Sequence, residues 1–337
     1  MVRNAAQLFS TAVATHRAEL RGTLTAVSAP GAVDLSVHVG ELRFANPILA
    51  ASGTFGYGIE FAHLVDLNLL GGIVVKGLSL EPMNGAPAPR LCETSGGMLN
   101  AVGLQNVGVR AFVAEKLPAL RTYRTAIVAN VFGHTVEEYV EVIRVLEDAE
   151  GLAAYELNVS CPNVAQGGLQ YGSDPRMTAE VVAAAGKVAR RPVWVKLSPN
   201  VTDIAAIARA AEAAGANALT VANTYLGMSV DYRTRRSRVG NLTGGLSGPA
   251  IKPITLRLVY EVCQVVKIPV LGLGGIQTPE DVMEYLIVGA SAAQVGTAQF
   301  VDPRACLTLL RGLEKLCEEA KICNINDIRG SLDAQKY

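Results

Sequence analysis

Lysine and asparagine side chains recur at the ends of short apolar segments along this 337-residue chain. The polar residues concerned are Lys76, Asn130, Asn158, Lys196, Asn223 and Thr224, and Asn100 in a long loop joins them. A side-chain amide has two donors and one acceptor group, so this set suits a planar ligand with alternating C=O and N–H groups. Any one of these asparagines could instead be a turn residue or a helix cap. Taken together, they predict a binding site at one rim of the fold.

A cysteine follows one of these segments, in the sequence Asn158-Val-Ser-Cys-Pro-Asn163. The four histidines of the chain lie elsewhere in the sequence, so a cysteine–histidine nucleophile is not indicated. A thiolate at Cys161 could instead accept a proton from a substrate C–H group. The other five cysteines show no C-x-x-C spacing. We expect them to be reduced thiols, and we expect no metal site.

Glycines follow the last two apolar segments, as Gly274 and Gly275 in one case and Gly296 with Thr297 in the other. Small residues there leave backbone N–H groups open to an anion. The loops after strands seven and eight are the usual phosphate site of α/β barrels. Tight turns alone would also explain the glycines. The pattern nevertheless favours a cofactor that carries a phosphate.

Eight short apolar segments must position these residues, and they alternate with helical patterns. We expect strands at residues 48–51, 72–76, 126–130, 154–158, 193–197, 218–222, 270–272 and 292–295. Unbroken apolar runs are typical of parallel strands buried on both faces. Eight such strands alternating with helices predict a (β/α)8 TIM barrel. A doubly wound open sheet is the alternative, disfavoured because the chain has no G-x-G-x-x-G or Walker A motif.

Local signals complete the expected architecture. Residues 34–44 read as a short N-terminal β-hairpin. Helix starts are predicted at Thr135, with Glu138 completing a capping box, and at Thr278 and Asp302, each followed by proline. Two long βα loops, 78–106 and 225–248, are expected over the active site. The second loop carries a basic run, expected to be solvated or an interface: Arg233, Arg235, Arg236 and Arg238.

The composition narrows the class of protein. Apolar residues make up 50% and charged residues 18% of the chain, which favours a globular fold over disorder. Lysine plus arginine and aspartate plus glutamate both total 30, so attraction to nucleic acid or anionic membranes is not expected. No apolar run has the length of a membrane span. Residues 1–32 are expected to be a flexible extension, faintly similar to a transit peptide, and residues 33–337 a single domain in the cytoplasm.

Longer stretches carry a family pattern. They are residues 46–58, 75–82, 97–106, 129–133, 158–163, 195–200, 222–224, 243–253, 274–276 and 295–297. Together they resemble the dihydroorotate dehydrogenase family, and within it the cysteine-containing, NAD-linked class (class 1B). The resemblance implies a flavoprotein of pyrimidine (UMP) biosynthesis, an oxidoreductase that converts (S)-dihydroorotate to orotate.

The resemblance also implies roles for particular residues. One FMN per chain would be bound by Ser52, Lys76, Gly77, Asn130, Asn158, Lys196, Ala222, Gly248, Gly274, Gly275, Gly296 and Thr297. Substrate would be held by Lys76, Asn100, Ala101, Val102, Gly103, Leu104, Asn158, Asn163, Asn223 and Thr224. Cys161 would remove the C5 proton of dihydroorotate while hydride passes from C6 to the flavin. Lys196 would stabilise the anionic reduced flavin.

The same resemblance implies a partner. Electrons would pass to NAD through a subunit with FAD and a [2Fe–2S] cluster, with two copies of each subunit around a homodimer of this chain. Two departures from the family pattern stand out. Val107 replaces a common proline, which is expected to loosen its loop, and Ala222 replaces a larger aliphatic residue. The alternatives are a fumarate-linked enzyme of the cysteine class, a dihydropyrimidine dehydrogenase-like barrel and a non-catalytic scaffold. In the pyrimidine-reducing barrels a histidine usually takes the place of Asn163.

Overall fold

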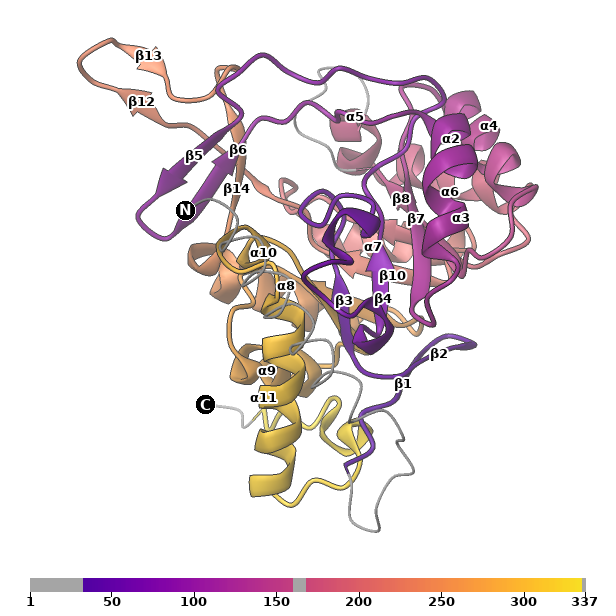
Figure 1. The fold of residues 1–337 in the computed structure, drawn as a ribbon, viewed down its shortest axis with the longest axis vertical. Helices are drawn as coiled ribbons and strands as arrows, with labels where there is room; N and C mark the ends of the chain where they lie inside the picture. The colour runs from indigo at the N-terminus through magenta and orange to yellow at the C-terminus, as the bar shows by residue number, and fades with distance from the viewer. Residues whose placement is uncertain (1–32, 160–167, 335–337) are drawn as a thin grey trace, which may run out of the picture.

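The computed structural model describes residues 33–159 and 168–334 (Figure 1). The expected N-terminal extension, residues 1–32, lies outside the described residues. Eight parallel strands close into a barrel in the order β3-β4-β7-β8-β9-β10-β15-β16. They are β3 (Ile48–Ala50), β4 (Gly72–Val74), β7 (Ala126–Val131), β8 (Ala154–Asn158), β9 (Val193–Lys196), β10 (Ala218–Val221), β15 (Val270–Leu273) and β16 (Ala292–Val295). The predicted TIM barrel is confirmed, with each strand within two residues of its expected bounds.

Helices cover the outside of the barrel (Figure 1). They are α2 (Val109–Ala111), the π-helical η3 (Phe112–Lys116), α3 (Leu117–Leu120), α4 (Val136–Glu147), α5 (Gly168–Ser173), α6 (Pro175–Gly186), α7 (Ile204–Ala213), α8 (Lys252–Cys263), α9 (Pro279–Ile287), α10 (Ala298–Val301) and α11 (Ala305–Glu319). Short 3-10 turns are η1 (Ile59–Phe61), η2 (Leu67–Leu69), η4 (Pro249–Ile251) and η5 (Ile325–Ile328). The first crossover, from β3 to β4, therefore uses two 3-10 turns in place of an α-helix.

The predicted helix starts have three different outcomes. At α9, Thr278 and Asp281 form the reciprocal bonds of a capping box, as expected. At α4, Thr135 accepts from the backbone N–H of Glu138, but the Glu138 carboxylate bonds the N–H of His134. At α11 the prediction is wrong, because Asp302 accepts from the N–H of Arg304 in a turn that precedes the helix.

The N-terminal hairpin is confirmed as β1 (Val37–Val39) paired antiparallel with β2 (Leu42–Phe44). Phe44 is 1% exposed, and its ring lies 6.1 Å from that of Trp194, the second residue of β9. Both rings are therefore removed from water near the point where β9 enters the barrel. Their burial adds apolar contact at the end of the barrel opposite the carboxyl ends of the strands.

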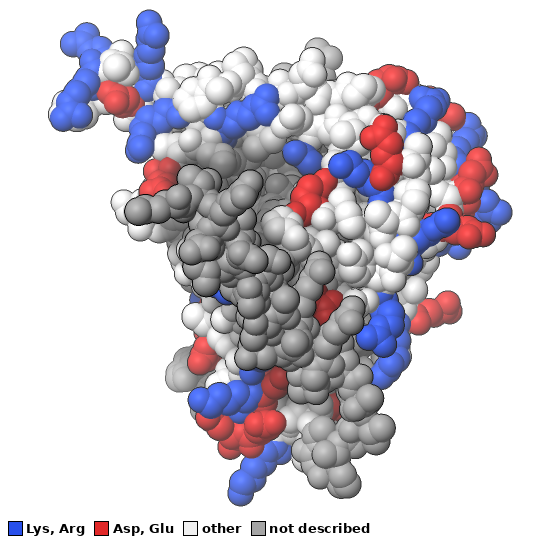
Figure 2. Space-filling model, in the orientation of Figure 1, with Lys and Arg blue, Asp and Glu red and all other residues white. Residues whose placement is uncertain are grey.

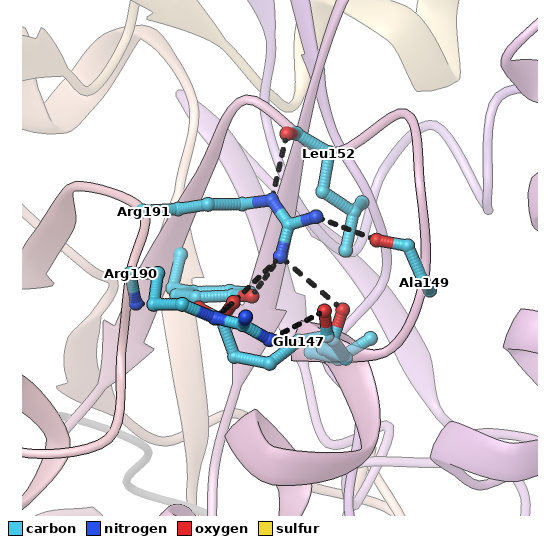
Figure 3. A network of polar contacts seen from close by, with 7 residues as sticks. Glu147, Ala149, Leu152, Arg190 and Arg191 are labelled. Carbon is cyan, nitrogen blue, oxygen red and sulfur yellow. Dashed lines mark hydrogen bonds and ion pairs between the residues drawn. The ribbon is translucent and has the colours of Figure 1, made fainter.

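An arginine-centred network fastens α4 to the start of β9 (Figure 3). The guanidinium of Arg191 donates to Glu147 Oε2 at 3.0 Å, to the hydroxyl of Tyr155 at 2.8 Å and to the carbonyl of Ala149 at 2.6 Å. Arg190 donates to the same carboxylate through its backbone N–H and its Nε. Burial alone would raise the pKa of Glu147, but these donors outweigh it and lower that pKa.

The two long loops contain strands that the sequence did not predict. One antiparallel sheet joins β5 (Leu91–Thr94) and β6 (Gly97–Asn100) of the first loop to β11 (Tyr225–Gly227) and β14 (Gly244–Ser247) of the second. The join is the β6–β14 pairing, in which Asn100 lies opposite Gly245. The two loops therefore form one covering structure rather than two independent loops.

A second hairpin projects from this covering sheet (Figure 1). It pairs β12 (Val230–Asp231) with β13 (Arg236–Ser237). The basic run of the sequence lies on it with all four arginines exposed. Figure 2 shows lysine and arginine side chains gathered on the same projection. The exposure of the four arginines agrees with the expected solvated loop, and an interface at this loop stays a prediction. Across residues 33–159 and 168–334, no helix has the length and apolar character needed to cross a membrane.

Candidate active site

A cavity of about 1250 Å³, part of it open to solvent, lies at the carboxyl ends of the barrel strands. Its wall includes every residue expected to bind the cofactor, namely Ser52, Lys76, Gly77, Asn130, Asn158, Lys196, Ala222, Gly248, Gly274, Gly275, Gly296 and Thr297. It also includes Asn100, Val102, Leu104, Asn223 and Thr224 of the expected substrate set. Residues as far apart in the sequence as Ser52 and Thr297 thus share one wall, as the carboxyl rim of a parallel barrel requires.

Two described residues of the expected site are not part of this wall. They are Ala101 and Gly103, which lie between the lining residues Asn100, Val102 and Leu104 in the segment that follows β6. Ala101 is fully buried instead. Cys161 and Asn163 lie outside the described residues, so their expected roles stay predictions.

Lysines bring positive charge to two sides of the cavity. Lys196, at the end of β9, is 5% exposed, and its Nζ donates to Ser52 Oγ at 3.2 Å. Lys76 follows β4 and lines the cavity. Burial lowers the pKa of Lys76, the nearby charge of Arg90 lowers it further, and Glu60 opposes both. A bound anion would relieve the cost of keeping these ammonium groups away from water.

The asparagine amides orient one another. Asn223 donates from Nδ2 to the Oδ1 of Asn158 at 3.3 Å, and its own Oδ1 accepts from the backbone N–H of Thr224 at 2.8 Å. Asn100 donates to the carbonyl of Gly245 at 3.0 Å, which ties it to the covering sheet. Each of these amides has one end held by the protein. The set is therefore pre-organised to recognise the polar edge of a planar ligand.

The loops after β15 and β16 are the segments that the sequence predicts to be an anion cradle. Gly275 has φ of +69°, and a Cβ there would come within 2.7 Å of the Cβ of Lys252 and 2.9 Å of the carbonyl of Gly248. Only glycine allows these segments to approach so closely. Within the described parts of the chain, the N–H groups of Gly275, Gly296 and Thr297 donate to no carbonyl. They are therefore available to a phosphate.

The departure at Val107 does not loosen its loop in the way expected. The N–H of Val107 donates to the hydroxyl of Tyr57 at 3.0 Å, a bond that proline could not make. The neighbouring Asn106 side chain bonds the N–H groups of Ser79 and Gly108 and the carbonyl of Leu104. The loop is thus tied at several points. The other departure, Ala222, follows a cis peptide bond after Val221 and lines the cavity.

Sequence reasoning missed part of the wall. The additional lining residues include Thr54, Leu91, Met98, Gln105, Ser247, Ile251, Leu273, Ile276, Gln277 and Phe300. Leu91 and Met98 reach the cavity because they belong to the covering sheet, which the sequence did not predict. Thr54 and Ser247 stand inside family motifs, at 46–58 and 243–253. The same motifs contain Ser52 and Gly248, which are expected to bind the cofactor, so the motifs could also have identified Thr54 and Ser247.

The fold and this cavity define a (β/α)8-barrel protein with a ligand site at its carboxyl rim, built for an anionic group and a planar polar ring. The chain belongs to the dihydroorotate dehydrogenase family, whose model matches residues 34–317. This is a family of oxidoreductases, and membership implies FMN as the cofactor. Among the described residues, Asn130 Oδ1 has no hydrogen-bond partner and the N–H groups of Gly275, Gly296 and Thr297 donate to no carbonyl, and both observations fit that group.

Similar proteins carry two kinds of name. A dihydroorotate dehydrogenase A (fumarate) of Solibacter usitatus is 61% identical over 85% of this chain and 94% of its own length. A dihydroorotate dehydrogenase B (NAD(+)), catalytic subunit, of Geotalea uraniireducens is 50% identical over 90% of this chain and 99% of its own. A crystal structure of DHODH from Eimeria tenella in complex with ferulenol shares the fold, with a TM-score of 0.75, 21% identity and 92% coverage of each chain.

Proposed function

We propose that this chain oxidises (S)-dihydroorotate to orotate with one bound FMN and passes the electrons to NAD through a partner subunit. The observation that carries the proposal is the cavity, which gathers all twelve expected cofactor residues and the asparagine set in a chain of this family. The proposed site residues are those of the cavity wall together with Cys161 and Asn163. The proposed domain, residues 33–337, and its cytoplasmic location remain predictions.

Two groups of residues would hold the cofactor. The N–H groups of Gly275, Gly296 and Thr297 would bind its phosphate. Asn130, Lys196 and Ser52 would surround the ring system. When bound, FMN supplies the hydride acceptor for the oxidation. The positive charge of Lys196 would favour a negatively charged reduced ring over the neutral oxidised one.

The substrate would lie against the asparagine amides. The dihydroorotate ring contains amide C=O and N–H groups, which Asn100, Asn158 and Asn223 can pair with. Its carboxylate is negative at neutral pH, and Lys76 would offset that charge. Thr224 is held by Asn223 and stands at the same wall. Binding by several short, pre-oriented side chains would place the reacting carbons with little loss of freedom.

Cys161 would serve as the base that takes the C5 proton. A thiolate holds a proton well near neutral to alkaline pH, since a free cysteine titrates at about 8.5. Its place in the sequence, three residues after the cavity residue Asn158, supports this role. The proposal needs the thiolate only as a proton acceptor, with no bond between sulfur and substrate.

The electron acceptor is the part on which similar proteins differ. Several relatives about 50% identical are named NAD(+) catalytic subunits, and that word implies a second subunit. The relative at 61% identity is named for fumarate. We propose the NAD-linked route, with FAD and a [2Fe–2S] cluster in the partner, a homodimer core and two copies of each subunit. Direct fumarate reduction is the second candidate, favoured by the name of that relative.

A steady-state assay separates the two candidates. Purified chain loaded with FMN is mixed with dihydroorotate and, in turn, an artificial dye, fumarate or NAD. We expect dye reduction, slow or no NAD reduction by the chain alone, and NAD reduction once the electron-transfer subunit is added. Efficient fumarate reduction by the chain alone would assign the second candidate. Failure to reduce any dye with dihydroorotate would overturn the proposed oxidation itself.

A further inference from the structure

A fully buried carboxylate, Glu156, lies inside the barrel next to the cavity without being part of its wall. It precedes Asn158 by two positions on β8, so both side chains leave the same side of the strand. Its Oε1 accepts from Asn130 Nδ2 at 2.8 Å. Its Oε2 accepts from Thr220 Oγ1 at 2.7 Å and from Gln294 Nε2 at 2.6 Å. Three other barrel strands, β7, β10 and β16, thus supply it with three donors.

We infer that Glu156 is a positioning residue for the cofactor site, acting through the amide of Asn130. A carboxylate can only accept hydrogen bonds, so it admits the NH₂ end of that amide and excludes the oxygen end. Asn130 is 1% exposed and lines the cavity, and its Oδ1 has no hydrogen-bond partner among the described residues. Glu156 therefore fixes Asn130 as an acceptor at the wall of the cavity.

Gly77 makes room for this acceptor. A Cβ at position 77 would come 2.9 Å from Asn130 Oδ1, closer than side-chain carbons approach an oxygen. A buried acceptor without a donor costs free energy, so the site is suited to a ligand with an N–H group. The inference rests on the proposed function, in which that ligand is FMN. The oxidised flavin ring has one N–H group, at N3, and this is the donor that Asn130 would receive.

Glu156→Gln tests the role with almost no change in volume. The new amide keeps its oxygen toward the two donors Thr220 and Gln294, because that preserves two hydrogen bonds. Its NH₂ group then faces the NH₂ group of Asn130. The conflict is relieved when Asn130 turns over, which presents a donor to the cavity in place of the acceptor. We expect the dissociation constant for FMN to rise about 10- to 100-fold, the range for an unmatched buried polar group.

The reciprocal exchange provides the decisive comparison. Asn130→Asp alone places two carboxylates in contact and should also weaken FMN binding about 10-fold or more. The double variant Glu156→Gln with Asn130→Asp restores one donor facing one acceptor, with the original net charge. We therefore expect it to bind FMN more tightly than either single variant. Affinity is measured on apoprotein by quenching of flavin fluorescence, so no turnover is required.

A flavin analogue shows which ring atom is involved. FMN methylated at N3 lacks the proposed donor, so the wild-type apoprotein should bind it more weakly than FMN. In Glu156→Gln this preference should shrink, because Asn130 no longer presents an acceptor. Thr220→Val is the matched control: it removes one bond to Glu156 but leaves the bond to Asn130 in place. It should keep the wild-type preference and an FMN affinity within about threefold of wild type.

The outcomes separate this inference from the proposed function. Melting of each apoprotein variant shows whether it is folded, and the double variant remains informative if one single variant is not. An apoprotein of the wild-type chain that does not bind FMN would overturn the proposed function. Wild-type FMN affinity in Glu156→Gln, equal losses in Thr220→Val, or a double variant no better than the weaker single variant would overturn the role of Glu156 alone.

Discussion

The ammonium of Lys196 donates to the hydroxyl of Ser52 across the barrel mouth, with Nζ and Oγ 3.2 Å apart. Lys196 ends the fifth barrel strand and Ser52 follows the first, 144 positions away in the sequence. This bond holds one end of a long, flexible side chain in place. The positive charge of Lys196 is thereby fixed at the wall of the cavity, where it would interact with the flavin that is proposed to bind there.

Replacing Lys196 tests that charge. In Lys196→Ala we expect a flavin potential about 30–60 mV more negative, the equivalent of losing one charge-assisted hydrogen bond. Spectroscopic titration against a reference dye measures this potential. The exposed Lys187 supplies the matched control, since Lys187→Ala removes the same charge away from the cavity. An unchanged potential with full FMN in Lys196→Ala would contradict the assignment.

Cys161→Ala should leave FMN bound and slow the reduction of the flavin by dihydroorotate. A positioned base contributes about 10²–10⁴-fold, so the loss should lie in that range. Stopped-flow absorbance records the rate. In the wild-type chain the rate should rise with pH through about 8.5, where a free thiol titrates, and the variant should lack this rise. Cys323 is an exposed free thiol, so Cys323→Ala should match wild type.

Lys76 should make substrate affinity depend on alkaline pH. Burial lowers the pKa of Lys76 below the ordinary value of 10.5. The ammonium form is therefore lost, as pH rises, earlier than for an exposed lysine. The carboxylate of dihydroorotate stays negative, so KM should rise on the alkaline side below pH 10.5, while kcat follows Cys161. In Lys76→Arg the side chain stays positively charged at alkaline pH. The alkaline rise in KM should therefore disappear, whether or not the variant binds dihydroorotate as tightly as wild type at neutral pH.

Gly275→Ala should impair the anion cradle. The added Cβ meets Lys252 and the carbonyl of Gly248 at less than 3 Å, and the residue has a positive φ. The loop must move, so we expect the FMN dissociation constant to rise at least about tenfold, the effect of about 1.4 kcal/mol. Equilibrium dialysis with FMN measures it. Gly186, at the end of α6, has open space around it, and Gly186→Ala should bind FMN as wild type does.

Glu147→Gln should destabilise the fold without touching the cavity. Removing one side of a largely buried charge pair costs on the order of 3 kcal/mol. Because the pKa of Glu147 is lowered in the folded protein, its contribution is present above its ordinary pKa of 4.5 and lost as pH falls through the lowered value. The difference in free energy of unfolding between wild type and Glu147→Gln should therefore become smaller as the pH is lowered. Urea unfolding at pH 7 and at low pH measures this difference. A stability difference that is the same at both pH values would contradict the lowered pKa of Glu147.

The barrel could be predicted from the sequence because a parallel strand buried on both faces leaves a local signature. Segments such as 193–197 and 292–295 are short, mostly apolar and bounded by turn residues. The covering sheet left no such signature. Its strands have three or four residues, and Asn100 finds its partner Gly245 in a loop far along the chain.

The site was predictable where family motifs mark it and less so elsewhere. Ala101 and Gly103 are within a motif but do not line the cavity, because the motif does not express how the backbone turns after β6, where Gly103 and Leu104 both have positive φ. Glu156 is the reverse case, a residue near the site that no family motif marks. It lies inside an apolar strand, and its importance depends on Asn130, Thr220 and Gln294, which come from three other strands.

The pairing of β6 with β14 has a consequence for protein engineering. Because the segment after β4 and the segment after β10 share one hydrogen-bonded sheet, neither can be grafted onto another barrel by itself. A transplanted segment would arrive with an unpaired edge and with Asn100 lacking the carbonyl that orients it. We expect such a chimera to acquire the substrate preference of the donor barrel only when both segments are exchanged together.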